Sequence, residues 1–342
     1  MSTAPQRLLI IRFSALGDVA MTVAAIYSLA QQYPQLQIDV ATTPFCARLF
    51  IAPPANVAVH GLDLKGKYHG VPGTLRLLRY LAALRPTMIA DLHNVCRTWI
   101  LDTFFRLKGL KVSMVDKMRS GRNRVLRHKA EQPNFVNRYA GVFAALGYPV
   151  ELSFRTLFPD GTPAPAVAIE HPAVGIAPFA RYYNKTYPLE MMREVVELVT
   201  GSGINVYLFG ARGQEAEMLG AWTPFNKRCH SLAGRFGLEE ELALMANMDV
   251  MVSMDSANQH MASLTATPVV SLWGSTTPEC GFMGYGQSRD NALVARLNCQ
   301  PCSIAGKPEC PLGTLDCLRT LRPRAVADKI ISLASPNSHN RP

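Results

Sequence analysis

The sequence predicts an α/β protein built from two Rossmann-like, doubly wound domains with parallel sheets. Three observations support this prediction: strand-like runs alternate with helix-like runs, 342 residues suffice for two cores of ordinary size, and a stretch rich in Pro, Gly and small residues divides the chain near its middle. Such alternation is typical of parallel sheets covered by helices on both faces. Two such domains would face each other across a cleft lined by the carboxyl ends of their strands.

The domain boundaries follow from the dividing stretch, "FPDGTPAPAVAIEHPA", whose composition is that of a linker. We predict an N-terminal domain over 1–160, a linker over 161–172, a C-terminal domain over 173–335 and a tail over 336–342. The C-terminal "RPRAVADKIISLAS" predicts a closing helix. The predicted strands are "RLLIIRF", "QIDVATT", "TMIADLH" and "LKVSMVD" in the first domain, and "AVGIAP", "INVYLFG", "DVMVSM" and "PVVSLWG" in the second.

The first strand leads to a candidate functional residue, Asp18. "LLIIRF" is apolar, and "VAMTVAAIYSLAQQY" repeats apolar residues at helical spacing, so Asp18 lies at the turn between a strand and a helix. One interpretation is a helix N-cap, because an Asp oxygen accepts a backbone N–H of the first turn. The other is a reactive carboxylate at the carboxyl end of a parallel strand, where open α/β sheets bind ligands.

The formal net charge of +10 favours an anionic partner: a nucleic acid, an acidic membrane surface or a phosphorylated substrate. The segment from Lys117 to Lys129, "KMRSGRNRVLRHK", holds six Lys or Arg and no acid. It is either a solvated face or an anion-binding segment. A nucleic-acid partner is disfavoured, because no aromatic residues are interleaved to stack bases and no nucleic-acid-binding motif is present elsewhere.

No run is long and apolar enough for a transmembrane helix, and Asp18 interrupts the only N-terminal stretch that resembles a signal peptide. We therefore expect a cytoplasmic protein.

The most informative stretch of the second domain is "DVMVSMDSANQHMASLTATPVVSLWGSTTP", residues 249–278. A strand ends at Met254, Asp255 and Ser256 provide capping chemistry, and the following helix carries His260 in its first turns. Backbone N–H groups at such a helix start form an anion site, where Asp255 fits a sugar hydroxyl better than a phosphate. Alternatively, Asp255 is a cap and His260 a core histidine. In "WGSTTP", small residues indicate close approach of the backbone to a ligand.

Two further segments follow strands of this domain. "APFARYYNKTYP" carries Lys185, either a point charge for a diphosphate or a solubilising lysine. "FGARGQEAE" is a glycine-rich turn before a helix, but it lacks the Walker and GxGxxG patterns. Neither P-loop kinase nor dinucleotide chemistry is therefore supported.

Four cysteines cluster in "NCQPCSIAGKPECPLGTLDC", namely Cys299, Cys302, Cys310 and Cys317, with the spacing C-x2-C-x7-C-x6-C. Three interpretations stay open: a structural zinc, a reduced thiol cluster, or disulfides. The remaining cysteines are scattered and fit packing roles better than nucleophilic ones: Cys46, Cys96, Cys229 and Cys280.

Taken together, these motifs resemble glycosyltransferase family 9, the ADP-heptose:lipopolysaccharide heptosyltransferases. The resemblance covers nearly the whole chain in order and rests on "IRFSALGDV", "IADLHNVCRT", "ARYYNKTYP", "LFGARGQE", "LAGRFGLEE" and "MDSANQHMASLTATPVVSLWGSTTP". It implies a GT-B fold, in which the N-terminal domain binds the acceptor and the C-terminal domain holds an ADP-sugar. It also implies an inverting transfer to an inner-core lipopolysaccharide acceptor, at the surface of the inner membrane, that needs no cofactor.

The resemblance also implies roles for individual residues. Asp18 is the general base, and Lys185 neutralises the donor diphosphate. The chain departs from the family at Ala257, where glycine is common, and alanine does not reach positive φ cheaply. The other residues expected to bind the donor are Gln214, Glu215, Phe236, Asp255, Ser256, Ala257 and His260. The residues expected to bind the phosphorylated acceptor are Ser14, Arg97, Arg119, Arg122 and Arg124.

Two alternatives stay open. One keeps the fold but changes the reaction, to a transferase or epimerase that uses another nucleotide sugar. The other is a non-enzymatic basic module that binds anionic lipid or nucleic acid.

Overall fold

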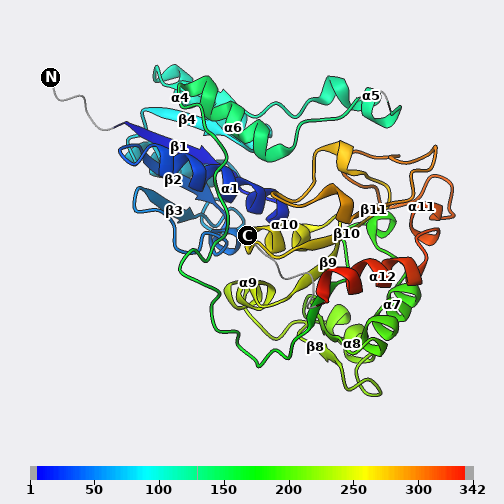
Figure 1. The fold of residues 1–342 in the computed structure, drawn as a ribbon. Helices are drawn as coiled ribbons and strands as arrows, with labels where there is room; N and C mark the ends of the chain where they lie inside the picture. The colour runs from blue at the N-terminus through cyan, green and yellow to red at the C-terminus, as the bar shows by residue number, and fades with distance from the viewer. Residues whose placement is uncertain (1–5, 129, 336–342) are drawn as a thin grey trace. The chain divides into compact units, whose positions relative to one another are not determined.

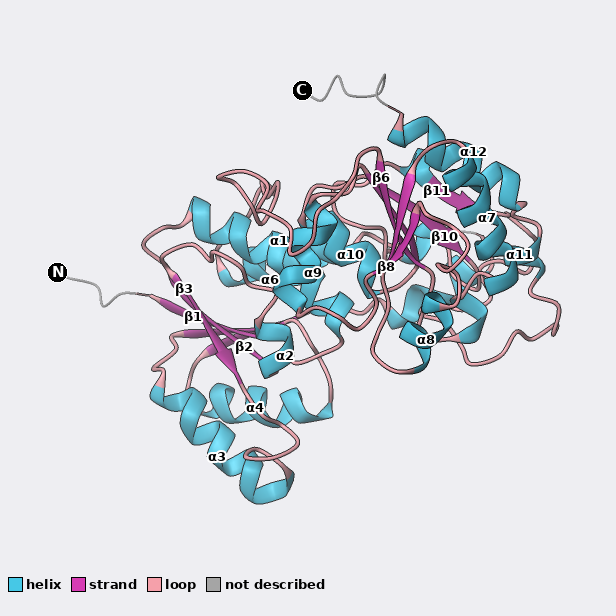
Figure 2. Ribbon diagram, turned by 90° about the horizontal axis from the view of Figure 1, so that it is seen from below, coloured by secondary structure: helices cyan, strands magenta, loops and turns pink. Residues whose placement is uncertain are grey.

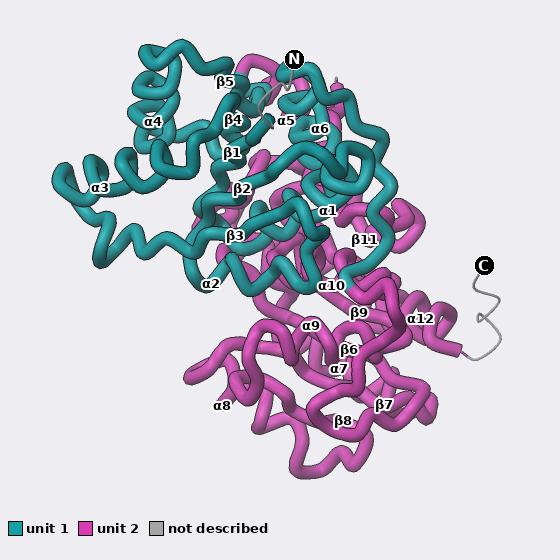
Figure 3. The backbone as a smooth tube through the Cα atoms, turned by 90° about the vertical axis from the view of Figure 1, so that its left-hand side faces the viewer, with its two compact units in different colours: residues 1–119, 134–157 teal, residues 120–133, 158–342 magenta. Residues whose placement is uncertain are grey.

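The computed structural model describes residues 6–128 and 130–335, so the predicted tail over 336–342 and Lys129 lie outside the described residues. The chain forms two compact units, which Figure 3 shows in two colours. Unit 1 comprises residues 1–119 and 134–157, and unit 2 comprises 120–133 and 158–342. This division differs from the sequence-based one, because residues 120–133 group with unit 2. So do residues 158–160, which we expected in the N-terminal domain, and the stretch 161–172, which we expected to link the domains.

Unit 1 is built on a parallel sheet with the strand order β3-β2-β1-β4-β5. Helices α1 and α6 cover one face of this sheet, and α3 and α4 cover the other (Figure 2). The core between the sheet and the second helix pair contains Leu9, Ile11, Leu77 and Phe105. The elements are β1 (Arg7–Ile11), α1 (Leu16–Gln32), β2 (Gln37–Thr42), α2 (Pro44–Ala47), β3 (Val57–Gly61), α3 (Gly70–Ala83), β4 (Met88–Asp91), α4 (Cys96–Leu107), β5 (Lys111–Met114) and α6 (Phe135–Leu146).

Unit 2 is built on a second parallel sheet, with the order β11-β10-β9-β6-β7-β8 (Figure 1). Helices α7 and α12 pack together on it, and Val195, Val199, Val326 and Ile330 join the same core. The strands are β6 (Ala173–Ala177), β7 (Asn205–Leu208), β8 (Cys229–Ser231), β9 (Val250–Met254), β10 (Val269–Trp273) and β11 (Ala292–Val294). The α-helices are α5 (Arg122–Leu126), α7 (Leu189–Gly201), α8 (Gln214–Gly220), α9 (Leu238–Ala246), α10 (Ala257–Leu264), α11 (Asp316–Arg319) and α12 (Pro323–Ala334). Short 3-10 turns complete the chain: η1 (Arg119–Gly121), η2 (Tyr183–Lys185), η3 (Pro278–Cys280) and η4 (Arg289–Asn291).

All eight predicted strands are present, and α12 is the predicted closing helix. The sequence missed β3, β8 and β11, and each of these is an edge strand. An edge strand lies partly in solvent, so it lacks the continuous apolar run of a strand buried on both faces. None of the described helices combines the length and the apolar character needed to cross a membrane.

Candidate active site

Three of the predicted functional residues follow strands at the switch points of their sheets. In unit 1 the chain order reverses between the neighbouring strands β1 and β4, and in unit 2 between β6 and β9. Loops leave the carboxyl ends of strands at such a switch point in opposite directions and open a crevice between them. Asp18 follows β1, Lys185 follows β6, and Asp255 follows β9. Each unit therefore carries charged residues at its own switch point.

Asp18 is the third residue of α1, not its N-cap. The helix begins at Leu16, so the cap position falls on Ala15, and the Asp18 carboxylate reaches back to accept the Ala15 N–H at 3.2 Å. The same oxygen, Oδ2, lies 2.7 Å from Nη2 of Arg12. The carboxylate is thus held by two donors, and its side chain is still 28% exposed.

Arg12 is the functional neighbour that the sequence analysis missed. Its side chain is only 6% exposed, and its Nη1 donates to the carbonyl oxygen of Leu92 at 2.6 Å. Burial by itself lowers the pKa of Arg12, but the nearby Tyr139 and Asp18 act in the opposite direction and the pKa is raised overall. Its position at the end of an apolar strand could have indicated this role in the sequence, because a buried arginine needs a carboxylate partner.

Further ionisable groups surround this pair. Burial, and then the positive charges of Arg12 and Lys117, lower the pKa of His93 to about 3, so its imidazole is neutral at physiological pH. Beneath them, burial and then the neighbouring Asp91 raise the pKa of Asp102 to about 8. Asp91 itself accepts the backbone N–H groups of the two residues that follow Leu92, at 2.8 and 2.9 Å. The carboxyl end of the unit 1 sheet is therefore lined by a partly buried cluster of ionisable groups, of which His93 is neutral.

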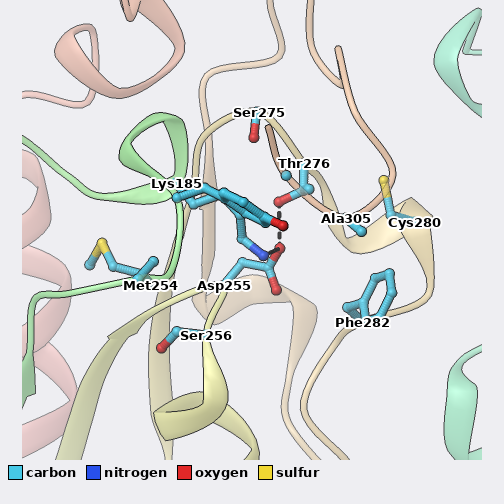
Figure 4. A network of polar contacts seen from close by, with 12 residues as sticks. Lys185, Met254, Asp255, Ser256, Ser275, Thr276, Cys280, Phe282 and Ala305 are labelled. Atoms are coloured by element: carbon cyan, nitrogen blue, oxygen red, sulfur yellow. Dashed lines mark hydrogen bonds and ion pairs between the residues drawn. The ribbon is translucent and has the colours of Figure 1, made fainter. Parts of the chain in front are cut away.

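In unit 2, Lys185 and Asp255 form a buried ion pair (Figure 4). Nζ of Lys185 lies 2.7 Å from Oδ2 of Asp255, and the two side chains are 12% and 4% exposed. Thr276, in the loop after β10, donates its hydroxyl to the same oxygen at 2.5 Å. Asp255 is not a helix cap, because the N-cap position of α10 falls on Ser256. The structure instead uses Asp255 to hold the lysine at the end of the sheet.

The loop that carries Lys185 is fixed by its neighbour Asn184, which is almost fully buried. Asn184 accepts the Ser275 backbone N–H and hydroxyl at 2.9 Å each, on its carbonyl and amide oxygens respectively. Gly274 allows this contact, because a Cβ there would lie 2.3 Å from the Asn184 carbonyl oxygen. We expected the small residues of "WGSTTP" to let a ligand approach the backbone; at Gly274 the close approach is made by the protein itself. Likewise, a Cβ at Gly306 would lie 2.6 Å from Cδ of Lys185.

The remaining residues expected at the donor site lie on several elements of unit 2. Ser256 and Ala257 begin α10, and His260 is buried on the same helix. Gln214 is the exposed first residue of α8, and Glu215 accepts the Ala211 N–H at 2.7 Å. In the turn after β8, the guanidinium of Arg235 lies over the ring of Phe236. Its Cζ is 5.3 Å from the ring centroid. Among the residues expected to bind the donor, Lys185 and Asp255 form an ion pair.

Three of the five residues expected to bind the acceptor belong to unit 1. Ser14 is exposed between β1 and α1, and Arg97, the second residue of α4, is close enough to His93 to help lower its pKa. Arg119 is exposed and is the last residue of the first segment of unit 1.

The other two, Arg122 and Arg124, lie on α5 and belong to unit 2. We expected the whole basic segment in the N-terminal domain. Packing explains why α5 belongs to unit 2, because Val125 of α5 is buried against Cys280 and Ile304. Val125, with Leu126 packed against the same cluster, thus anchors the basic segment to unit 2.

The four clustered cysteines line one cavity of about 110 Å³ in unit 2. All eight cysteines of the chain are free thiols, so the disulfide interpretation is not realised in the structure. Within residues 6–128 and 130–335, no group of three or more His, Cys, Asp or Glu side chains is placed to hold a metal ion, so a structural zinc is not supported. Burial, and then the charges of neighbouring thiols, raise the pKa of Cys317 to about 12. The arrangement is that of a reduced thiol cluster.

Comparison with known proteins shows the family of this chain. Residues 75–312 match the model of glycosyltransferase family 9 (heptosyltransferase). The chain is 27% identical over 307 residues to lipopolysaccharide heptosyltransferase 2 of Salmonella typhimurium, covering 80% of this chain and 84% of that protein. It is 26% identical over 300 residues to lipooligosaccharide heptosyltransferase 2 of Haemophilus ducreyi, with the same coverage.

Solved structures show the same fold. The family 9 glycosyl transferase from Veillonella parvula superposes with a TM-score of 0.73 at 16% identity, covering 98% of both chains. Escherichia coli heptosyltransferase WaaC, solved with ADP-2-deoxy-2-fluoro heptose, superposes with a TM-score of 0.68 at 20% identity, covering 96% of this chain and 99% of that one. The two parallel-sheet units are those of the predicted GT-B fold. Motifs, fold and family model agree, and the chain belongs to glycosyltransferase family 9, the heptosyltransferase family.

Proposed function

We propose that this glycosyltransferase moves a heptose from ADP-heptose to an inner-core lipopolysaccharide acceptor, with inversion at the anomeric carbon. One observation carries the proposal: Asp18 is held by Arg12 at the carboxyl end of β1, yet its side chain stays partly exposed. The relatives named above are heptosyltransferases of the same family, which supports heptose as the transferred sugar.

In the proposed reaction, Asp18 accepts the proton of an acceptor hydroxyl as that oxygen attacks the anomeric carbon of the donor. The bond between the anomeric carbon and the diphosphate oxygen breaks, and ADP departs with the electron pair. A general base contributes about 10²- to 10⁴-fold to such a step. Because attack and departure occur on opposite faces of the sugar, the anomeric configuration inverts.

Lys185 stabilises the negative charge that develops on the departing diphosphate. Its ammonium has three donor protons, and the Asp255 carboxylate lies 2.7 Å from it. The buried pair holds the cation in place before the reaction, which is the condition for strong electrostatic stabilisation of a transition state. The N–H groups at the start of α10, near Ser256 and Ala257, are proposed as further diphosphate donors.

The acceptor is proposed to be a phosphorylated lipid at the cytoplasmic face of the inner membrane, with the protein bound there peripherally. The formal net charge of +10 and the arginines expected to bind the acceptor support an anionic partner. The proposal needs no metal ion or cofactor.

The donor assignment is tested without an acceptor by titrating the protein calorimetrically with ADP, UDP and GDP. ADP should bind selectively, and Lys185→Ala should weaken it about tenfold or more, as expected for a charged hydrogen bond. Lys227→Ala, which removes an exposed lysine of the same unit, is the matched control and should leave the affinity unchanged.

Preference for UDP contradicts the ADP-sugar assignment, and absence of nucleotide binding contradicts the transferase site itself. The stereochemistry is tested separately, by NMR of the product: retention of the anomeric configuration contradicts direct displacement with Asp18 as the base.

A further inference from the structure

The inference concerns the outer surface of α3 and α4, the two helices that cover one face of the unit 1 sheet (Figure 2). Their inner sides are accounted for, because Leu77 and Leu81 of α3 and Leu101 and Phe105 of α4 pack in the core of unit 1. We call the exposed residues of these two helices, together with Lys108 at the end of α4, the α3–α4 surface.

The α3–α4 surface exposes large apolar side chains at helical spacing. On α4, Trp99, Ile100 and Leu107 are 43%, 53% and 85% exposed, and on α3, Val71 and Leu75 are 76% and 52% exposed. A single exposed leucine needs no explanation. Here, however, five such residues share two helices of one layer, and each helix is already apolar on its inner side. Exposed apolar surface of this kind marks an interaction site.

The charges on this layer have one sign. Between residues 64 and 115 the sequence holds nine Lys or Arg, and its only acids are Asp91 and Asp102. Both acids are fully buried, so the stretch presents no carboxylate to solvent. Arg76 and Arg79 of α3 and Arg106 and Lys108 of α4 are exposed beside the apolar residues. The surface is therefore basic and apolar at once.

We infer that the α3–α4 surface binds the interface of an anionic phospholipid membrane. Arginine and lysine attract the anionic headgroups, while Trp99, Ile100 and Leu107 enter the boundary between headgroups and acyl chains. A nucleic acid matches the charge but offers no apolar phase for four aliphatic side chains. The inference rests on the proposed function for the peripheral location at a membrane. It adds the surface that makes the contact, on helices α3 and α4, which carry the exposed Leu75 and Leu107.

Vesicle co-sedimentation of the full chain, without donor or acceptor, tests the inference. Vesicles of phosphatidylglycerol and phosphatidylethanolamine should bind the protein, added salt should weaken binding, and vesicles of phosphatidylcholine alone should bind it weakly. Each basic residue near an anionic surface contributes about 1 kcal/mol, so Arg76→Glu with Arg106→Glu should lower the partition coefficient about tenfold or more. Lys227→Glu with Arg228→Glu changes the net charge equally on an exposed part of unit 2 and is the control.

The apolar contribution is tested by Ile100→Ser with Leu107→Ser, which should also weaken binding about tenfold, because each side chain then loses its burial in the interface. Phe225→Ser is the matched control, since Phe225 is a 98% exposed apolar residue of unit 2. All of these side chains are exposed, so Tm and ADP affinity should stay unchanged and report an intact fold.

Absence of binding to anionic vesicles overturns the inference. So does an equal loss of vesicle binding in the surface variants and the control variants. A third contrary outcome is unchanged vesicle binding while Ile100→Ser with Leu107→Ser converts a dimer to a monomer in light scattering. The last result would make the surface a contact between copies of this chain. Failure of the proposed function is distinguishable, because it appears as absent ADP binding or absent transfer while vesicle binding persists.

Discussion

The two units carry ion pairs with the same distance between nitrogen and oxygen, and the more buried member is the cation in one and the carboxylate in the other. In unit 1, Arg12 and Asp18 are 2.7 Å apart, and in unit 2, Lys185 and Asp255 are also 2.7 Å apart. In the first pair the cation is buried and the carboxylate is the more exposed member. In the second pair the carboxylate is buried, and the lysine is the more exposed member.

Each buried member also has a second anchor on the protein. Arg12 donates to the Leu92 carbonyl oxygen, and Asp255 accepts the hydroxyl of Thr276. We propose that the more buried ion of each pair serves as support and that the less buried ion faces a substrate. In this proposal the partly exposed carboxylate of Asp18 acts as a base, and the ammonium of Lys185, which is 12% exposed, binds a diphosphate. The following predictions test this comparison.

The largest effect is expected at Asp18, the presented member of the first pair. Asp18→Asn keeps the shape and removes the proton acceptor, so the transfer rate should fall about 10³-fold. ADP affinity should stay the same, because the proposed donor site lies in unit 2. The check is a transfer assay with ADP-heptose beside an ADP titration; near-normal turnover would remove Asp18 from the role of base.

Breaking the second pair should cost both stability and affinity. Lys185→Met leaves Asp255 buried without its cation, and loss of one partner of a buried pair costs about 3–5 kcal/mol. The double variant Lys185→Met with Asp255→Leu removes both charges and should recover most of the stability but none of the ADP affinity. Chemical denaturation and nucleotide titration separate the two effects. If the double variant regains ADP affinity, the lysine is only structural.

A smaller effect is expected at Arg12, the supporting member of the first pair. Arg12→Ala leaves Asp18 in place with the Ala15 N–H as its remaining donor. The loss of a hydrogen bond to a charged group, about 1.5–3 kcal/mol, should appear in denaturation. The transfer rate should fall less than in Asp18→Asn, and Arg12→Lys should restore part of it. An Arg12→Ala enzyme with normal kcat would contradict the positioning role.

The last effect is a pH dependence of stability at Asp102, which develops gradually over several pH units. Burial and the adjacent Asp91 raise its pKa to about 8, against an ordinary value of 3.8, so the folded chain binds this proton more tightly than the unfolded chain. The stabilisation is complete below about pH 4 and is lost as the pH rises through about 8. Asp102→Asn cannot ionise, so its Tm should exceed that of the wild type above pH 8 by about 2–4 °C for each kcal/mol of relieved repulsion.

Thermal unfolding across pH 6 to 9 checks this prediction, with the exposed Asp328→Asn as control. Parallel Tm curves for Asp102→Asn and the wild type would show that Asp102 does not titrate in this range.

Most of the architecture was predictable because a strand buried on both faces needs a continuous apolar run. "RLLIIRF" and "DVMVSM" lie in the interiors of their sheets as β1 and β9 and were recognised. β8 and β11 have only three residues each at sheet edges, so their sequence signal is weak. The place of residues 120–133 was not predictable either, because it depends on the packing of Val125 and Leu126 against residues that are distant in the sequence.

The candidate site also combines features that were predictable from the sequence with features that were not. The sequence by itself determined the residue types, the strands they follow and the family motif, because apolar periodicity and turn chemistry are local properties of the chain. Only the tertiary structure decided that Lys185 meets a carboxylate 70 residues away, that Thr276 shares that carboxylate, and which ion of each pair is withdrawn from water. Burial depends on how distant segments pack, and packing sets whether a charge serves as support or is presented to a substrate.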